Sequence, residues 1–245
     1  ANSLNRITFD SAKARFGILA AGKAYLDTIQ ALNDLGIGPH EAAKIGLRVI
    51  KVGMPWPLEP YFIRTFTEGL DEVLVIEEKR PVIESQFKEL LYNCSPKNRP
   101  RVVGKFNEAN EPMLPSAGEL SPARIAKVIA KRLEPLYRSE AISRHLQFLD
   151  GKEAELKARK IDFERLPYFC SGCPHNTSTK VPEGSRAAAG IGCHYMVLWM
   201  DRNTSTFTHM GGEGANWIGQ APFTKTEHIF TNLGDGPYFH SGIMA

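Results

Sequence analysis

The chain has 245 residues, of which 42% are hydrophobic and 23% are charged, a composition typical of a globular protein. Its formal net charge is +3 and its basic residues are scattered, whereas a nucleic-acid-binding protein usually concentrates them on one face, so nucleic acid is excluded as a partner. No apolar run approaches the roughly 20 residues that a membrane helix needs. No basic-then-apolar signal opens the chain, so we expect a cytoplasmic protein without a membrane contact.

Both ends of the chain suggest a larger protein. There is no initiator Met, and residues 236–245 stop where a helix is expected to begin. We therefore expect an internal fragment whose upstream and downstream domains are missing.

Residues 14–104 alternate between two periodicities. The pattern predicts strands and helices in turn, with strands at 16–19, 47–52, 73–76 and 102–103, and helices at 23–35, 60–69 and 81–91. Such alternation is typical of an open parallel sheet covered by helices, an α/β fold. We assign residues 1–106 to this first domain.

The alternation of predicted strands and helices ends after residue 106. Residues 107–165 are interpreted as a linker and a helical segment, in which Ser121-Pro122 caps a helix over 123–133 and helix-prone residues continue to about Arg159. From residue 166 cysteines, glycines and histidines crowd together. We assign residues 166–245 to the beginning of a second, truncated α/β domain, with a strand at 228–233 and a helix after it.

Three cysteines form a candidate metal site. Cys170 and Cys173 have the Cys-x-x-Cys spacing that directs two thiolates at one metal, and Cys193 follows from another loop. A [4Fe–4S] cluster and a structural zinc site both take four ligands. The spacing leaves both open, since His175 or His194 could complete a zinc set and a fourth cysteine could lie downstream. Cys94 is interpreted as a small, mostly buried apolar residue.

Glycine-rich segments mark candidate ligand loops. Gly234-Asp235-Gly236 follows an apolar strand, where a carboxylate can hold Mg²⁺, although a plain turn is the default interpretation. Segments 190–194 and 209–214 could present backbone amides to phosphate, or could simply be flexible loops. Histidines gather in the same stretch, a pattern that favours a polar functional site: His175, His194, His209, His228 and His240. Of these, His228 is expected to be structural.

Taken together, these motifs resemble the indolepyruvate ferredoxin oxidoreductase family. Segment 168–176, Tyr-Phe-Cys-Ser-Gly-Cys-Pro-His-Asn, is similar to the cysteine motif that opens its thiamine-diphosphate-binding domain. Segment 190–193, Gly-Ile-Gly-Cys, resembles the next motif, and 234–242 resembles the thiamine diphosphate and Mg²⁺ motif. Residues 14–104, with Val-Ile-Glu-Glu-Lys at 75–79, resemble the transketolase-C-terminal-like domain that precedes it.

The resemblance implies oxidative decarboxylation of an aryl 2-oxoacid to acyl-CoA, with coenzyme A as co-substrate and electrons passed through a [4Fe–4S] cluster to ferredoxin. It implies that Cys170, Cys173 and Cys193 bind the cluster, that Asp235 binds Mg²⁺, and that the enzyme is a homo-oligomer. His194 and His209 are the expected catalytic residues. The residues expected to line thiamine diphosphate are Gly190, Gly192, His194, His209, Met210, Gly211, Gly234, Asp235 and Gly236.

The chain departs from the family pattern in several places. The glutamate that activates the aminopyrimidine would lie upstream, whereas the second Mg²⁺ ligand and the fourth cluster cysteine would lie past Ala245. Pro237 stands where a smaller polar residue is expected. We therefore predict that the chain alone is inactive. The alternatives are a zinc-stabilised interaction module without catalysis and a thiamine-dependent decarboxylase or synthase without a cluster.

Overall fold

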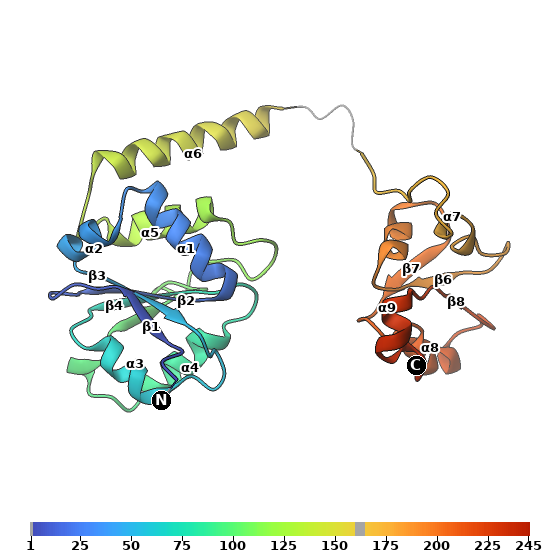
Figure 1. The fold of residues 1–245 in the computed structure, drawn as a ribbon, viewed down its shortest axis with the longest axis horizontal. Helices are drawn as coiled ribbons and strands as arrows, with labels where there is room; N and C mark the ends of the chain where they lie inside the picture. The colour runs from blue at the N-terminus through green and yellow to red at the C-terminus, as the bar shows by residue number, and fades with distance from the viewer. Residues whose placement is uncertain (1, 160–164) are drawn as a thin grey trace. The chain divides into compact units, whose positions relative to one another are not determined.

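The computed structural model of the protein describes residues 2–159 and 165–245. It divides into two compact units, residues 1–159 and residues 160–245, called the first and second unit below (Figure 1). In the described residues no helix is both long and apolar enough to cross a membrane. Each unit is described by itself.

The first unit is built on a mostly parallel sheet with the strand order β1-β3-β2-β4-β5. Its strands are β1 (Arg6–Phe9), β2 (Phe16–Ala21), β3 (Leu47–Val52), β4 (Glu72–Ile76) and β5 (Arg101–Val103). Strands β2 to β5 run parallel, and β1 pairs antiparallel with β3 at one edge. The open parallel sheet predicted from the sequence is therefore confirmed.

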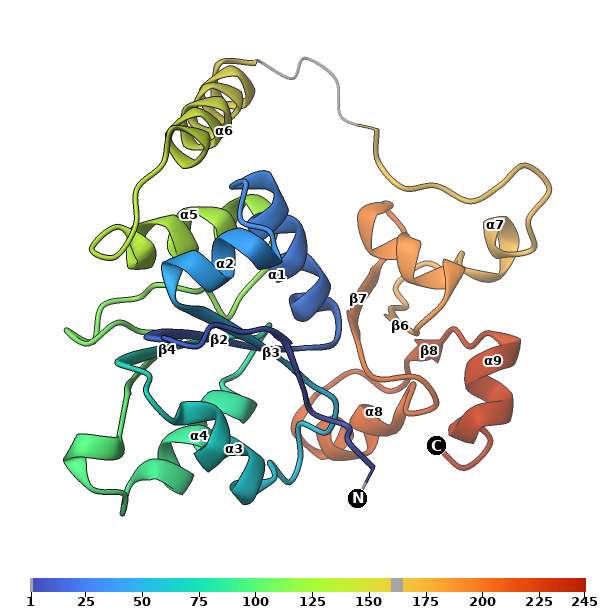
Figure 2. The same cartoon turned by 60° about the vertical axis from the view of Figure 1, so that its left-hand side comes forward.

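Helices cover both faces of this sheet. They are α1 (Gly22–Asp34), α2 (Pro39–Ile45), α3 (Pro60–Thr67), α4 (Val82–Leu91), α5 (Pro122–Leu133) and α6 (Glu140–Ala158), with a 3₁₀ turn η1 (Pro96–Asn98). Figures 1 and 2 show α1, α2 and α5 on one face and α3 and α4 on the other. Because both faces are covered, the central strands are continuous apolar runs, and β2 buries its first five residues.

Local signals explain where the helices begin and end. Pro60 opens α3, and the Glu59 carboxylate accepts hydrogen bonds from the next two free amides of the helix. Ser121 caps α5 in the same way by accepting from the Arg124 amide. Helix α2 was not predicted, although it also begins with Pro39, because its seven residues are too few for a clear periodicity.

Residues 107–159 belong to the first unit and pack against its sheet and helices. Ile125, Ile129 and Leu133 of α5 are fully buried in one core cluster with Leu32 and Leu35 at the end of α1. Helix α6 ends at Ala158, as its composition predicted, and buries Ile142 in the same cluster. The segment interpreted as a linker and helices thus covers the sheet, and the division between the compact units falls after residue 159.

The second unit holds a smaller parallel sheet with the strand order β7-β6-β8. Its elements are α7 (His175–Ser178), β6 (Ala187–Ala189), the 3₁₀ turn η2 (Cys193–Trp199), β7 (Thr204–Phe207), α8 (Ala215–Gln220), the 3₁₀ turn η3 (Ala221–Phe223), β8 (Phe230–Thr231), α9 (Asp235–Pro237) and the π turn η4 (Tyr238–Gly242). The strand predicted over 228–233 is only two residues long, whereas β6 and β7 were not predicted. Three alanines and a Thr-Ser-Thr run carry no apolar alternation that could reveal them.

Candidate functional site

The candidate site lies at the carboxyl ends of the three strands of the second unit. Gly190 follows β6, segment 208–214 follows β7, and segment 232–235 follows β8. Because the strands are parallel, these three connections leave the sheet at the same edge. The predicted cofactor residues, far apart in the sequence, are thereby brought to one edge.

His194 is buried in the middle of these connections, with only 1% of its surface exposed. A methyl group added at Gly190 would lie 2.5 Å from its Nε2 atom, and one added at Gly234 would lie 3.2 Å from its Cε1 atom. The ring therefore occupies the space that side chains at these two positions would need. Nε2 has no hydrogen-bond partner among the described residues.

The environment of His194 favours its neutral form. Burial lowers the pKa of the imidazole from its usual value, and the nearby His175 ring lowers it further. The Glu213 carboxylate acts in the opposite direction but is the smallest of the three influences. An imidazole with a lowered pKa is uncharged near neutral pH and can donate or accept one hydrogen bond at each nitrogen.

Glu213 connects two of the loops. Its side chain is buried, and its Oε2 atom accepts a hydrogen bond of 2.7 Å from the Gly211 amide. Its Oε1 atom accepts one of 3.2 Å from the Ile191 amide, in the loop after β6. Sequence reasoning missed this residue because a glutamate in a glycine-rich loop is usually exposed. The available signal was its rarity, since residues 166–245 contain only nine Asp, Glu, Lys and Arg in total.

The loop after β7 also contacts the end of the chain. Gly211 has a φ of +82°, a left-handed conformation that favours glycine. Its carbonyl accepts a hydrogen bond of 3.2 Å from the Ser241 hydroxyl, and Ser241 also lies 2.8 Å from Nδ1 of His240. His209 and Met210, both predicted to line the cofactor, are exposed on this loop.

Asp235 lies where the motif predicted it, just after β8. It is the first residue of α9, and its side chain is exposed. Its Oδ1 atom accepts a hydrogen bond of 2.9 Å from the Gly236 amide. The other carboxylate oxygen remains open to solvent or to a ligand.

The Cys-x-x-Cys segment forms a tight turn. The amide of Cys173 donates to the carbonyl of Cys170 at 3.1 Å, and Asn176 donates its side-chain amide to the same carbonyl at 3.0 Å. Arg202 holds the turn from outside by donating to the carbonyls of His175 and Asn176. These hydrogen bonds hold the backbone of the turn in place.

The cysteine turn meets the glycine loops through side-chain packing. Cys173 packs against the small cluster of Phe169, Ala189 and Val197, while the His175 and His194 rings lie 5.4 Å apart. Cys170 and Cys193 are exposed, and the four cysteines are free thiols. Within residues 2–159 and 165–245, no group of three Cys, His, Asp or Glu side chains is arranged to hold a metal.

Two other predictions concern residues outside this edge. Cys94 packs against the core cluster of the first unit, and its thiol lies 3.9 Å from the Leu90 carbonyl. The residue is partly buried, less than the sequence interpretation expected, and its packing agrees with a small apolar residue. His228 shares a hydrogen bond of 3.1 Å with the Ser185 hydroxyl through its Nε2 atom. This contact joins two loops and agrees with a structural role.

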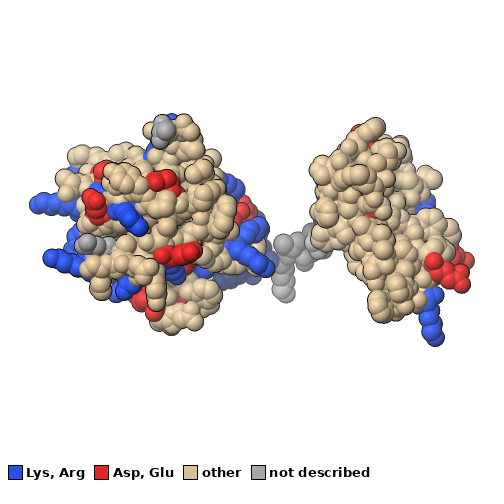
Figure 3. All heavy atoms as spheres, turned by 90° about the horizontal axis from the view of Figure 1, so that it is seen from below, with Lys and Arg blue, Asp and Glu red and all other residues tan. Residues whose placement is uncertain are grey.

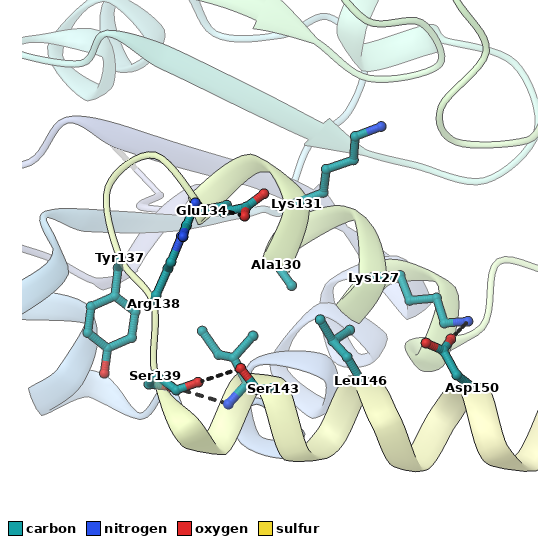
Figure 4. A pocket seen from close by; sticks show the side chains of 11 residues that line it. Lys127, Ala130, Lys131, Glu134, Tyr137, Arg138, Ser139, Ser143, Leu146 and Asp150 are labelled. Carbon is teal, nitrogen blue, oxygen red and sulfur yellow. Dashed lines mark hydrogen bonds and ion pairs between the residues drawn. The ribbon is translucent and has the colours of Figure 1, made fainter.

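The first unit has a hollow of about 360 Å³ between α5 and α6 (Figure 4). Its charged side chains are largely paired with one another, since Lys127 binds Asp150 and Arg138 binds Glu134. None of the predicted cofactor residues lies there. Figure 3 shows positive and negative side chains interspersed over the first unit, whereas the face of the second unit seen there is mostly uncharged.

The fold and the site define an α/β protein with glycine-rich loops at the carboxyl edge of a parallel sheet. A family model described as the indolepyruvate ferredoxin oxidoreductase middle domain matches residues 5–159. The chain therefore belongs to the indolepyruvate ferredoxin oxidoreductase family, which confirms the resemblance of the sequence motifs. The match covers the first unit, whereas the candidate site lies in the second.

Curated relatives extend the similarity over both units. Indolepyruvate oxidoreductase subunit IorA of Thermococcus kodakarensis is 28% identical over 251 residues, covering 95% of this chain and 35% of the relative. The same subunit of Pyrococcus horikoshii is 27% identical with the same coverage, and that of Methanothermobacter marburgensis is 25% identical over 99% of this chain and 36% of the relative. The chain thus spans about a third of the length of these relatives.

Solved structures are more distant. A split-gene transketolase, an inactive β4 tetramer, covers 55% of this chain and 42% of its own at 18% identity, with a TM-score of 0.37. The 2-oxoglutarate:ferredoxin oxidoreductase of Magnetococcus marinus covers 53% of this chain and 19% of its own at 13% identity, with a TM-score of 0.35.

Proposed function

We propose that the chain is part of an enzyme that oxidatively decarboxylates an aryl 2-oxoacid of the indolepyruvate kind, with coenzyme A as acyl acceptor and ferredoxin as electron acceptor. Family membership and the names of the curated relatives support the oxidoreductase class. The observation that carries the proposal is the convergence of the three glycine-rich connections around His194, with Asp235 at the end of β8. The remaining groups of the site are proposed to come from other domains and from a second copy of the enzyme.

The residues present fit thiamine diphosphate with Mg²⁺. Asp235 offers an exposed carboxylate of the kind that Mg²⁺ prefers, and the neighbouring Gly236 has no atom within 4 Å of the place where a side chain would begin, so the backbone of this connection is open to a ligand. The unpartnered Nε2 atom of His194 is a further polar group that a ligand could satisfy. When bound, thiamine diphosphate supplies the electron sink for decarboxylation. The proposed lining is Gly190, Gly192, His194, His209, Met210, Gly211, Gly234, Asp235 and Gly236.

His194 and His209 are the proposed catalytic residues, with different roles. The neutral imidazole of His194 is held by packing, so its Nε2 atom can hold or accept one proton at a fixed place. His209 is exposed, and its ring lies against the backbone of Gly212, where an added methyl group would be 2.7 Å from Cε1. It can exchange a proton with solvent.

The cysteines fit an iron–sulfur cluster in ligand type but not in arrangement. Cys170, Cys173 and Cys193 are free thiols on adjoining segments, yet they do not form a group of three metal ligands in the described residues. We propose them as three ligands of a [4Fe–4S] cluster whose fourth ligand comes from elsewhere, and no catalytic step is assigned through it.

Metal and cofactor content tests the proposal. The native enzyme, purified without oxygen, should contain about four iron and four sulfide for each copy of this chain and bind thiamine diphosphate only with Mg²⁺. Cys173→Ser should lose the iron and the brown colour, whereas the matched control Cys94→Ser should keep both. About one zinc in a colourless protein would support the zinc-stabilised module instead. Thiamine binding without iron would support a decarboxylase or synthase without a cluster.

A further inference from the structure

We propose that Glu213 is a positioning residue whose carboxylate links the loop after β6 to the loop after β7, and that cofactor binding depends on this link. The second part rests on the proposed function. Neither the sequence motifs nor the family resemblance assigns a role to this side chain. The inference comes from the two hydrogen bonds of its carboxylate.

The burial of Glu213 is the first argument. Only 3% of its surface is exposed, and an ionised carboxylate is costly to bury unless its oxygens are hydrogen-bonded. Both oxygens are satisfied, one by Gly211 two residues away and one by Ile191 22 residues away. Hydrogen bonds from backbone amides to a carboxylate are roughly twice as strong as neutral ones. The charge is therefore held by one contact on each loop.

The second argument is what lies between the two contacts. A methyl group added at Gly190 would lie 2.7 Å from Cγ of Glu213 as well as 2.5 Å from Nε2 of His194. The stem of the glutamate, the backbone of Gly190 and the buried imidazole are thus packed against one another. A change in the carboxylate would therefore alter the distance between the two loops and the position of the His194 ring.

The third argument concerns which amides remain free. The Gly211 and Ile191 amides point to Glu213, so they are not available to a diphosphate. Because both carboxylate oxygens of Glu213 accept hydrogen bonds from the protein backbone, Glu213 acts on the cofactor through the two loops that it connects. This is why we assign it a positioning role.

Glu213→Gln is the informative variant. The amide side chain keeps the size of glutamate but can accept from only one of the two backbone amides and turns its own N–H groups toward the other. The matched control is Glu227→Gln, because Glu227 is an exposed glutamate of the same unit. Both variants are made in the native enzyme.

Two measurements test the proposal separately. By hydrogen–deuterium exchange without cofactor, the amides of Ile191 and Gly211 should exchange faster in Glu213→Gln than in the wild type and in Glu227→Gln. By titration with thiamine diphosphate and Mg²⁺ at a temperature well below the thermal midpoint of the variant, where it is fully folded, the Kd should rise about 10-fold or more in Glu213→Gln.

The possible outcomes are distinct. Unchanged exchange at Ile191 and Gly211 would overturn the link itself. Faster exchange with an unchanged Kd, or faster exchange spread over the whole second unit, would overturn the positioning role and leave a purely structural one. If the wild type binds no thiamine diphosphate, the proposed function and the cofactor part of this inference both fail, whereas the exchange data still decide whether Glu213 links the loops.

Discussion

Arg132 of α5 forms a forked ion pair with Glu72, the first residue of β4, with 2.7 Å between Nε and Oε1 and a second contact between the other guanidinium nitrogen and Oε2. Both side chains are about 14% exposed, and Arg132 also binds Glu108 at 2.9 Å. The pair joins residues 60 positions apart. The pair therefore fixes α5 to the beginning of β4.

Removing the guanidinium should therefore destabilise the first unit. Arg132→Met leaves the largely buried Glu72 with the more exposed Arg101, 3.5 Å from Oε2, as its ion-pair partner. We expect a loss of about 2 kcal/mol in the free energy of unfolding, between the values for exposed and fully buried pairs. Arg138→Met is the control, because Arg138 is 79% exposed and its ion pair with Glu134 lies within the same stretch of chain, one turn away. Urea unfolding measures both. Equal midpoints for the two variants would contradict a structural role of the Arg132–Glu72 pair.

Gly190 should tolerate no side chain. Gly190→Ala forces a methyl group against His194, Glu213 and the Asn232 carbonyl, all within 2.7 Å, and overpacking of this kind costs about 1–3 kcal/mol. Gly219→Ala meets no atom within 4 Å and lies in α8, where alanine should stabilise the helix by about 0.5–1 kcal/mol. Denaturation followed by tryptophan fluorescence compares the two. If Gly190→Ala costs no more stability than Gly219→Ala, the packing around His194 described here is wrong.

Tyr137 should make the stability of the first unit depend on pH through Glu41. Its hydroxyl donates to Oε1 of Glu41 at 2.8 Å, and this bond, followed by one from Lys44, lowers the pKa of the carboxyl below its usual value. A carboxyl with a lowered folded-state pKa stabilises the fold above its unfolded pKa, and this stability is lost as the pH falls through the folded pKa. Tyr137→Phe should therefore be more destabilising at pH 7 than at pH 3.

An NMR titration of the Glu41 carboxyl provides the direct measurement. The pKa of Glu41 should rise in Tyr137→Phe and stay unchanged in the control Tyr92→Phe, since Tyr92 is 74% exposed. If Glu41 titrates identically in the two variants, the hydrogen bond does not cause the shift.

Asp235 should affect metal-dependent binding without affecting the fold. Asp235→Asn removes a charged oxygen ligand of the proposed Mg²⁺ site, so the affinity for thiamine diphosphate in the presence of Mg²⁺ should fall by a factor of about 10–100. Because the side chain is exposed and its hydrogen bond is to the amide of the neighbouring Gly236, stability should change by less than about 0.5 kcal/mol. Asp201→Asn, another exposed aspartate of the second unit, is the control. The same Mg²⁺ dependence in both variants would remove Asp235 from the metal site.

The sequence by itself determined the elements that carry a strong local period. Strands β2, β3 and β4 are largely buried runs of mostly apolar residues. Helices α1, α3, α4 and α5 have an apolar stripe, and a proline marks the beginning of α3, α4 and α5. Their order was enough to predict an open parallel sheet covered by helices. The chemistry-bearing motifs were also visible, because cysteines at Cys-x-x-Cys spacing and glycines around Asp235 are unusual within a few residues.

The tertiary structure alone decided which distant segments meet. The apolar stripe of α5 predicted a helix with a buried face, but only the packing of α5 against α1 in one core cluster makes it part of the first unit. The alanine strand β6 has no period to reveal it, since its burial comes from neighbours on either side. Glu213 has the sequence context of an exposed loop residue, and its function as a link depends on the Ile191 amide 22 positions earlier. A local period can be read from neighbouring residues of the sequence. A hydrogen bond between two loops forms only when the strands that carry these loops have paired in the sheet.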